Sequence, residues 1–130
     1  MKKLVELMLD NLSTKEVFLF QTRCEECGRE YKSKPLRFSK AGIMPQTQEK
    51  QIVYDAVYEQ EIRGARHSAV RQLAEHFNYC PICKRLVCNG CFLICEDLDM
   101  CRDCATRLKQ TGVPVLSEAD TEVICSAGTE

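Results

Sequence analysis

The sequence predicts a small, metal-stabilised α+β domain in which β-hairpins carry cysteine knuckles, with a helical insert and a C-terminal helix. Two observations favour this fold class. First, ten of the 130 residues are Cys, and eight of these ten form four Cys-x-x-Cys pairs. Second, strand-like segments flank the first pair, whereas apolar residues at helical spacing separate the first pair from the second. A chain of this length suits one compact domain with a modest core.

The N-terminal segment 1–12 predicts a short amphipathic helix that covers the core. Its expected apolar stripe consists of Leu4, Leu7, Met8 and Leu12, with Val5 and Leu9 beside it. Ser13 and Thr14 then interrupt the apolar pattern.

The next segment predicts a β-hairpin with a metal-binding turn. Residues 17–22 are β-branched and aromatic enough for a strand, and residues 29–38 predict the returning strand. Between them, Cys24 and Cys27 are followed by Gly28, where a sharp turn favours a residue without a Cβ. This arrangement is typical of a zinc knuckle on a hairpin.

Residues 46–78 predict a helical insert, formed by one long helix or two shorter ones that are bent or broken near Gly64. The apolar positions at helical spacing are Ile52, Val53, Ala56, Val57, Ala69, Val70, Leu73, Ala74 and Phe77. His67 and His76 lie in this insert. Because eight paired cysteines already complete two tetrahedral sites, we expect both histidines to be surface or packing residues.

The dense cysteine block of residues 80–108 includes the last pair, Cys101 and Cys104, which predicts the start of a C-terminal helix. Gly112 and Pro114 follow in the order expected at the end of a helix.

We expect one two-zinc domain over residues 1–116, with its helical insert at about 46–78, and an acidic tail over residues 117–130. The tail contains four acidic residues and no Lys or Arg. The formal net charge of the chain is −1, which argues against a protein that binds nucleic acid through overall positive charge.

The cysteines are expected in an intracellular, reducing compartment, which we take to be the cytoplasm. Glu6 and Asp10 interrupt the apolar run that a signal peptide would need, and no stretch approaches the roughly 18 apolar residues of a membrane span. We therefore expect no membrane partner. Regular Cys pairs in a reducing compartment favour metal sites over disulfides.

The four pairs predict two closed Zn²⁺ sites, that is, two ions per chain, because two pairs complete a tetrahedral four-thiolate site. The candidate ligands are Cys24, Cys27, Cys80, Cys83, Cys88, Cys91, Cys101 and Cys104. A rubredoxin-like iron site uses similar knuckles, but the chain has no separate redox motif and zinc is favoured. Cys95 follows apolar residues and is expected to behave as a small core residue, while Cys125 lies in the tail.

The residues alone leave two ways of grouping the pairs. Sequential grouping joins the first pair to the second and the third to the fourth. Cross-brace grouping joins the first pair to the third and the second to the fourth. Only residues 84–87 separate the second pair from the third, and in the cross-brace arrangement this linker is a β-segment with Leu86 and Val87 packed between the sites.

The block from Cys80 to Cys91, followed by Cys101 to Leu108, resembles treble-clef, cross-brace zinc fingers of the FYVE and RING-like type. Those fingers also place four residues between their second and third pairs, and they end with a Cys-x-x-Cys pair that opens a terminal helix. The resemblance and the short linker favour cross-brace grouping. One ion would then bind Cys24, Cys27, Cys88 and Cys91, and the other would bind Cys80, Cys83, Cys101 and Cys104.

Two departures limit what the resemblance implies. Residues 75–79 lack the basic motif with which FYVE fingers bind phosphoinositides, and the third pair offers no His of the kind found in RING ubiquitin ligases. The resemblance therefore implies a scaffold and neither of these activities.

We expect no enzymatic activity, because the closed sites leave no open metal position and no catalytic motif is present. The acidic clusters Glu25/Glu26 and 96–99 are expected to be solvated faces. The favoured function is a structural two-zinc module that acts as a protein–protein interaction or adaptor domain, with the helical insert as a docking face.

The alternative is a nucleic-acid-binding zinc-ribbon protein that uses the basic hairpin at 29–40. This hairpin contains Arg29, Lys32, Lys34, Arg37 and Lys40, with Tyr31 and Phe38 interleaved. Basic and aromatic side chains on paired strands can bind single-stranded nucleic acid. The sequence specifies neither the partner nor the oligomeric state.

Overall fold

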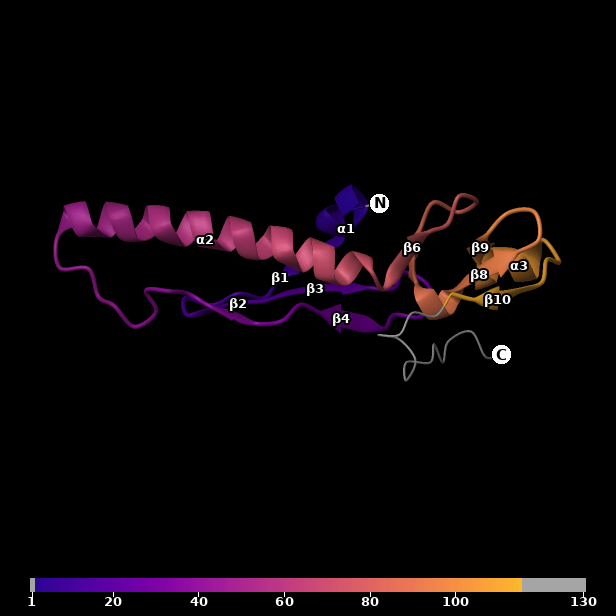
Figure 1. Cartoon of the computed structure of the whole chain (residues 1–130), viewed down its shortest axis with the longest axis horizontal. Helices are drawn as coiled ribbons and strands as arrows, with labels where there is room; N and C mark the ends of the chain where they lie inside the picture. Colours follow the sequence, from indigo (N-terminus) through magenta and orange to yellow (C-terminus); the bar gives the residue numbers. More distant parts are fainter. Residues whose placement is uncertain (1, 116–130) are drawn as a thin grey trace.

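The computed structural model describes residues 2–115 and has a small α+β fold with short antiparallel strands, as the sequence predicts. Its longest element, helix α2 (Gln48–Ala74), runs along a β-hairpin, and the loop of residues 39–47 joins the two at one end of the molecule (Figure 1). We call the hairpin and α2 together the arm. The cysteine-rich second half of the chain lies at the opposite end (Figure 1). The predicted acidic tail and Cys125 lie outside the described residues.

Helix α1 (Lys2–Met8) confirms the predicted N-terminal helix, but the predicted apolar stripe is wrong. Val5 is fully buried and Leu9 is nearly so, whereas Leu7 is 79% exposed. The helix ends at Met8, so Leu12 does not belong to it. Because α1 packs against both α2 and the hairpin, the face through Val5 is the one that becomes buried.

The hairpin consists of short strands rather than the two continuous strands predicted for residues 17–22 and 29–38. The strands of this region are β1 (Asp10–Asn11), β2 (Val17–Phe18), β3 (Phe20–Arg23), β4 (Glu30–Lys32) and β5 (Leu36–Arg37). β3 pairs with β1 and β4, and β2 pairs with β5, so the predicted hairpin is confirmed in outline. The interruptions have local causes. The N–H and C=O of Leu19 form hydrogen bonds with the segment that precedes β2, and Lys34 donates its N–H to a side chain on α2.

Helix α2 is one continuous helix, which confirms the predicted single long helix, and the break predicted near Gly64 as an alternative is wrong. Thr47 caps its N-terminus, where the hydroxyl accepts a hydrogen bond from the N–H of Lys50 at 3.1 Å. A Gly inside a helix costs about 1 kcal/mol relative to Ala. Burial of apolar residues on the following turns, including Ala69 and Leu73, outweighs that cost. The helix ends at Ala74, before the end of the segment predicted at 46–78.

Aromatic rings fill the space between α2 and the hairpin. Phe38 is fully buried, and its ring contacts Phe18, Tyr54 and Tyr58 edge-on, with centroids 5.7, 5.4 and 5.1 Å away. Such edge-to-face pairs contribute beyond the area they bury. Hydrogen bonds at the rim add to this packing, because Glu61 on α2 accepts from the N–H of Ser39 at 3.0 Å. The arm therefore has an aromatic core, which belongs to the same cluster of buried residues as the cysteines.

The second half of the chain forms two small sheets and a short helix. Its elements are β6 (Phe77–Tyr79), β7 (Leu86–Cys88), the 3₁₀ helix η1 (Asn89–Cys91), β8 (Phe92–Cys95), β9 (Met100–Cys101), α3 (Arg102–Arg107) and β10 (Gly112–Pro114). β6 pairs with β7, and β8 pairs with both β9 and β10, all antiparallel. The predicted C-terminal helix is thus confirmed as α3.

The predicted end of this helix is wrong. It ends at Arg107, after which Lys109 adopts a left-handed conformation with φ of 57°. Gly112 and Pro114 lie instead in β10, paired with β8. A Cβ on Gly112 would lie 2.5 Å from the carbonyl oxygen of Ile94, so close approach of the two strands requires this glycine.

The helices of residues 2–115 include none that combines the length and the apolar character needed to cross a membrane.

Candidate metal centres

Eight cysteines form two groups in which the four sulfur atoms lie within 4.8 Å of one another. We call them centre 1, made up of Cys24, Cys27, Cys88 and Cys91, and centre 2, made up of Cys80, Cys83, Cys101 and Cys104. Each group could hold a metal ion. The grouping is that of the cross-brace alternative and not of the sequential one.

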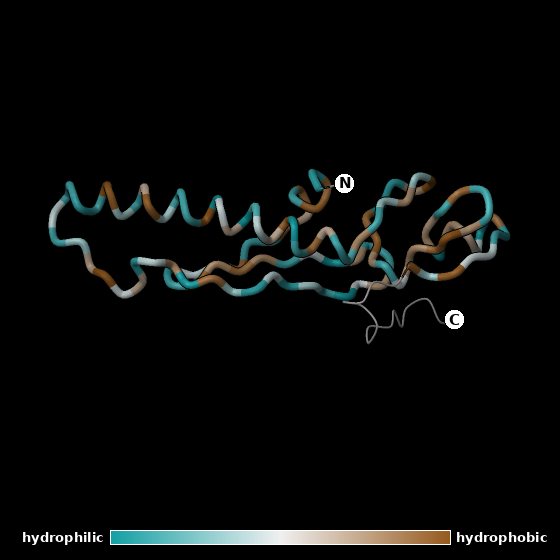
Figure 2. Tube along the Cα trace, in the orientation of Figure 1, coloured by the Kyte–Doolittle hydropathy of each residue, from teal (hydrophilic) through white to brown (hydrophobic). Residues whose placement is uncertain are grey.

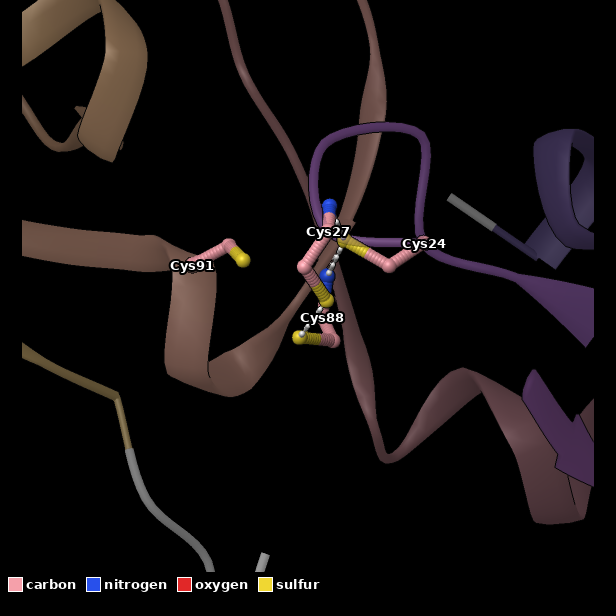
Figure 3. A group of neighbouring side chains, drawn as sticks. All are labelled: Cys24, Cys27, Cys88 and Cys91. Carbon is pink, nitrogen blue, oxygen red and sulfur yellow. Dashed lines mark hydrogen bonds between the residues drawn. The ribbon is translucent and has the colours of Figure 1, made fainter. Parts of the chain in front are cut away.

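Centre 1 joins the hairpin to the second half of the chain. Cys24 and Cys27 lie in the turn that follows β3, Cys88 ends β7 and Cys91 ends η1. In Figure 3 the four side chains converge, with Cys91 approaching from the side opposite Cys24. The sulfurs of Cys27 and Cys88 are 3.8 Å apart although 61 positions separate them in sequence.

The backbone around centre 1 presents N–H groups to a sulfur. Cys24 Sγ accepts hydrogen bonds from the N–H groups of Glu26 and Cys27, both at 3.4 Å, and of Cys88 at 3.2 Å. Donors that face a sulfur stabilise the thiolate form, which is the form that binds metals.

Centre 2 lies within the second half of the chain. Cys101 caps the N-terminus of α3, and its sulfur accepts from the N–H of Cys104 at 3.4 Å. Cys80 Sγ accepts from the N–H of Cys101, also at 3.4 Å. The Sγ–Sγ distances are 3.8 Å for Cys80 and Cys104 and 3.7 Å for Cys83 and Cys101.

The first two Cys pairs form turns of the same local geometry. In the first turn, the N–H of Gly28 donates to the C=O of Cys24, and in the second the N–H of Lys84 donates to the C=O of Cys80, each at 2.9 Å. The residue that closes each turn has a positive φ, 79° at Gly28 and 65° at Lys84. Gly28 therefore occupies the position that the sequence predicted for a residue without a Cβ, and Lys84 adopts the same conformation at a steric cost.

The surroundings shift the pKa of several thiols in the two centres. Hydrogen bonds from the other thiols of centre 1, chiefly that of Cys88, hold the pKa of Cys24 far below its ordinary value. Burial raises the pKa of Cys80, but hydrogen bonds from facing backbone N–H groups outweigh burial and lower it to about 7. Burial raises the pKa of Cys101 and of Cys104. A cation that binds at either centre would stabilise the thiolates and release protons.

Four charged side chains lie beside the centres, and none of them was predicted there from the sequence. Arg85 donates through Nε to Cys83 Sγ, and Arg107 donates through Nη2 to Cys104 Sγ, both at 3.2 Å. Glu25 and Glu26 are not simply solvated, as the sequence suggested, because each accepts hydrogen bonds from the segments around centre 2. Their positions between or next to cysteines are the only sequence signal that could have identified them.

The remaining candidate residues lie outside both centres. Cys95 is half-buried in β8 and packs against the core, as expected. His67 is exposed, and the ring of His76 stacks on that of Tyr31 with centroids 5.1 Å apart. All nine cysteines of residues 2–115 are free of disulfide bonds.

The basic hairpin lacks part of the surface that the nucleic-acid alternative requires. Arg29, Lys32, Lys34 and Arg37 are exposed, and Lys40 is half-buried. The interpretation of Phe38 as a side chain available to nucleic acid is wrong, because its ring lies in the core of the arm. Tyr31 is half-buried between His76 and Phe77.

Neither a family model, nor a curated protein, nor a solved structure matches this chain.

Proposed function

We propose that the protein is a structural two-zinc module that binds another protein, and that it is not an enzyme. Zn²⁺ is favoured at both centres because closed sets of four thiolates are typical of structural zinc sites. Such a set leaves no ligand position for a substrate. The grouping of the Cys pairs into two four-sulfur centres also supports the cytoplasm as its location, where cysteines stay reduced.

The second half of the chain supports a treble-clef, cross-brace arrangement for these sites. Three elements follow one another around centre 2: a turn with two cysteines, the β8–β9 hairpin and helix α3, which begins at the last two ligands. Centre 1 then binds the third Cys pair together with the distant first pair.

The observation that carries the protein-binding role is an apolar cluster at the end of the arm, which we call the apolar tip. Its members and their exposed fractions are Ile43 (52%), Met44 (76%), Ile52 (63%) and Val53 (58%). Pro45 and Tyr54 help to line an open pocket of about 360 Å³ there. Apolar segments are visible in the loop and at the start of α2 at this end of the molecule (Figure 2).

The position of the apolar tip suits a docking surface. At about 1.5 Å per residue, the 27 residues of α2 hold the tip roughly 40 Å from the opposite end of the helix. Ile43, Met44 and Val53 line the same pocket, and large contiguous apolar surfaces mark interaction sites on soluble proteins. The centres would thus anchor one end of a rigid arm while the other end contacts the partner.

The test is site-specific crosslinking in the native cell. A photo-crosslinking residue at Met44 should yield a protein adduct, whereas the same residue at Leu7, which is 79% exposed on α1, should not. Val53→Asp, added to the Met44 variant, should abolish the adduct while two zinc ions per chain remain. No adduct from position 44, or one that Val53→Asp leaves unchanged, would contradict the proposal.

The same preparation distinguishes the nucleic-acid alternative. A mobility-shift titration with single-stranded DNA and RNA across salt concentrations should show no salt-dependent complex. A complex that weakens steeply with salt, and weakens further in Arg29→Gln/Lys32→Gln, would favour the basic hairpin instead.

A further inference from the structure

Arg85 lies between the two centres and contacts the surroundings of both. On one side, Nε donates to Cys83 Sγ at 3.2 Å, and Nη2 lies 3.6 Å from Cys101 Sγ. On the other side, Nη1 donates to the backbone oxygen of Glu25 at 3.1 Å, and Nη2 donates to a carboxylate oxygen of Glu26 at 3.3 Å. One guanidinium group therefore joins two sulfurs of centre 2 to the turn that carries Cys24 and Cys27.

The two glutamates of that turn bind the segments that hold centre 2. The N–H of Glu25 donates to Leu86 C=O at 3.0 Å, and the N–H of Leu86 donates to the Glu25 carboxylate at 2.6 Å. Glu26 accepts from the N–H of Asp103, in the first turn of α3, at 3.3 Å. The side chain of Glu26 is only 11% exposed, so its contact with Arg85 is partly shielded from water.

We propose that Arg85 couples the two centres, so that a metal ion at either one raises the affinity of the other. The proposal rests on the proposed function, in which both centres bind metal. An ion at centre 1 fixes the turn of residues 24–27 and with it the two acceptors that orient Arg85. A divalent ion with four thiolates leaves a centre with two net negative charges, and the oriented guanidinium stabilises that charge at centre 2 through charge-assisted hydrogen bonds.

Linkage makes this effect reciprocal, so an ion at centre 2 raises the metal affinity of centre 1 by the same factor.

Arg107 provides a matched control. It also donates to a sulfur of centre 2, Cys104 Sγ, but its carboxylate partner is Asp103 on its own helix, at 3.5 Å. Loss of Arg107 should therefore weaken centre 2 without changing the coupling.

The test is an anaerobic Co²⁺ titration of the reduced, metal-free full-length chain, followed by the thiolate-to-cobalt absorption bands. Cys27→Ser disables centre 1 and reports the affinity of centre 2 alone. We expect this variant to lower the centre 2 affinity about fivefold or more, the lower bound of typical coupling between sites. In the Arg85→Gln background, Cys27→Ser should lower the centre 2 affinity by a clearly smaller factor, because the hydrogen bonds of Glu25 and Glu26 remain. In the Arg107→Gln background, it should lower that affinity as it does in the unaltered protein.

A second measurement keeps all eight cysteines. At one equivalent of Co²⁺, native mass spectrometry should show less one-metal species in the unaltered protein and in Arg107→Gln than in Arg85→Gln. Equal fractions in all three proteins, or an effect of Cys27→Ser that is undiminished in Arg85→Gln, would overturn the coupling through Arg85 while leaving two metal sites in place. Failure of the unaltered chain to bind Co²⁺ would instead overturn the proposed function together with the coupling.

Discussion

Replacement of Phe38 by Ala should destabilise the protein strongly, because this ring lies at the centre of the arm. The ring is fully buried, and truncation of a buried Phe to Ala costs about 3–5 kcal/mol. Three aromatic neighbours would also lose their edge-on contacts, each worth about 0.5–1.5 kcal/mol. We therefore expect a loss in the upper half of that range, about 4–5 kcal/mol.

The matched control is Leu36→Ala, two residues earlier in the same strand region. Leu36 is 42% exposed, so its truncation should cost less than about 1.5 kcal/mol. Urea unfolding followed by circular dichroism would measure both changes, with the free zinc concentration held fixed because bound metal adds to the stability. A loss below about 2 kcal/mol for Phe38→Ala, or equal losses for the two variants, would refute the aromatic core of the arm.

Three further predictions concern the centres and their turns. Cys101→Ser should release zinc and unfold the second half of the chain, whereas Cys95→Ser should keep two ions per chain. Elemental analysis would measure the zinc content, and zinc loss from both variants would make Cys95 a ligand. Lys84→Gly should raise the melting temperature slightly, with a gain of about 0.5 kcal/mol, because it relieves a positive φ. Gly28→Ala, at the equivalent position of the first turn, should lower the free energy of unfolding by about 1–2 kcal/mol. A loss of stability in Lys84→Gly together with a gain in Gly28→Ala would contradict the shared turn geometry. Acidification should release zinc, since protons compete for the thiolates, and a chelating dye should report release as pH falls; release only on alkalinisation would argue against thiolate ligands.

Local features of the fold were predictable from short stretches of sequence. The turn at Cys24–Gly28 and the start of α3 at Cys101 depend mainly on residues within a few positions of each other. Such a turn is formed by its own backbone hydrogen bonds, for example from the N–H of Gly28 to the C=O of Cys24. Spacing and residue type therefore carry enough information to predict it.

The errors in α1 and α2 arose where packing competes with a local preference. Either side of α1 is apolar enough to be buried, and only the docking of α1 on α2 selects Val5 over Leu7. Gly64 weakens a helix by itself, but the buried residues that follow it keep α2 continuous. A sequence pattern describes the candidates for burial, whereas the neighbours determine which candidate is buried.

Four cysteine pairs, a hairpin around the first pair and a long helical insert were predictable from the residues alone. The packing of the whole chain brings Cys27 to Cys88 across 61 positions and places Arg85 between centre 2 and the turn that carries Cys24 and Cys27. The physical reason is the range of the interactions. Turns and helices form through hydrogen bonds between near neighbours, whereas a four-sulfur group and a bridging guanidinium require distant segments that the packed core brings together.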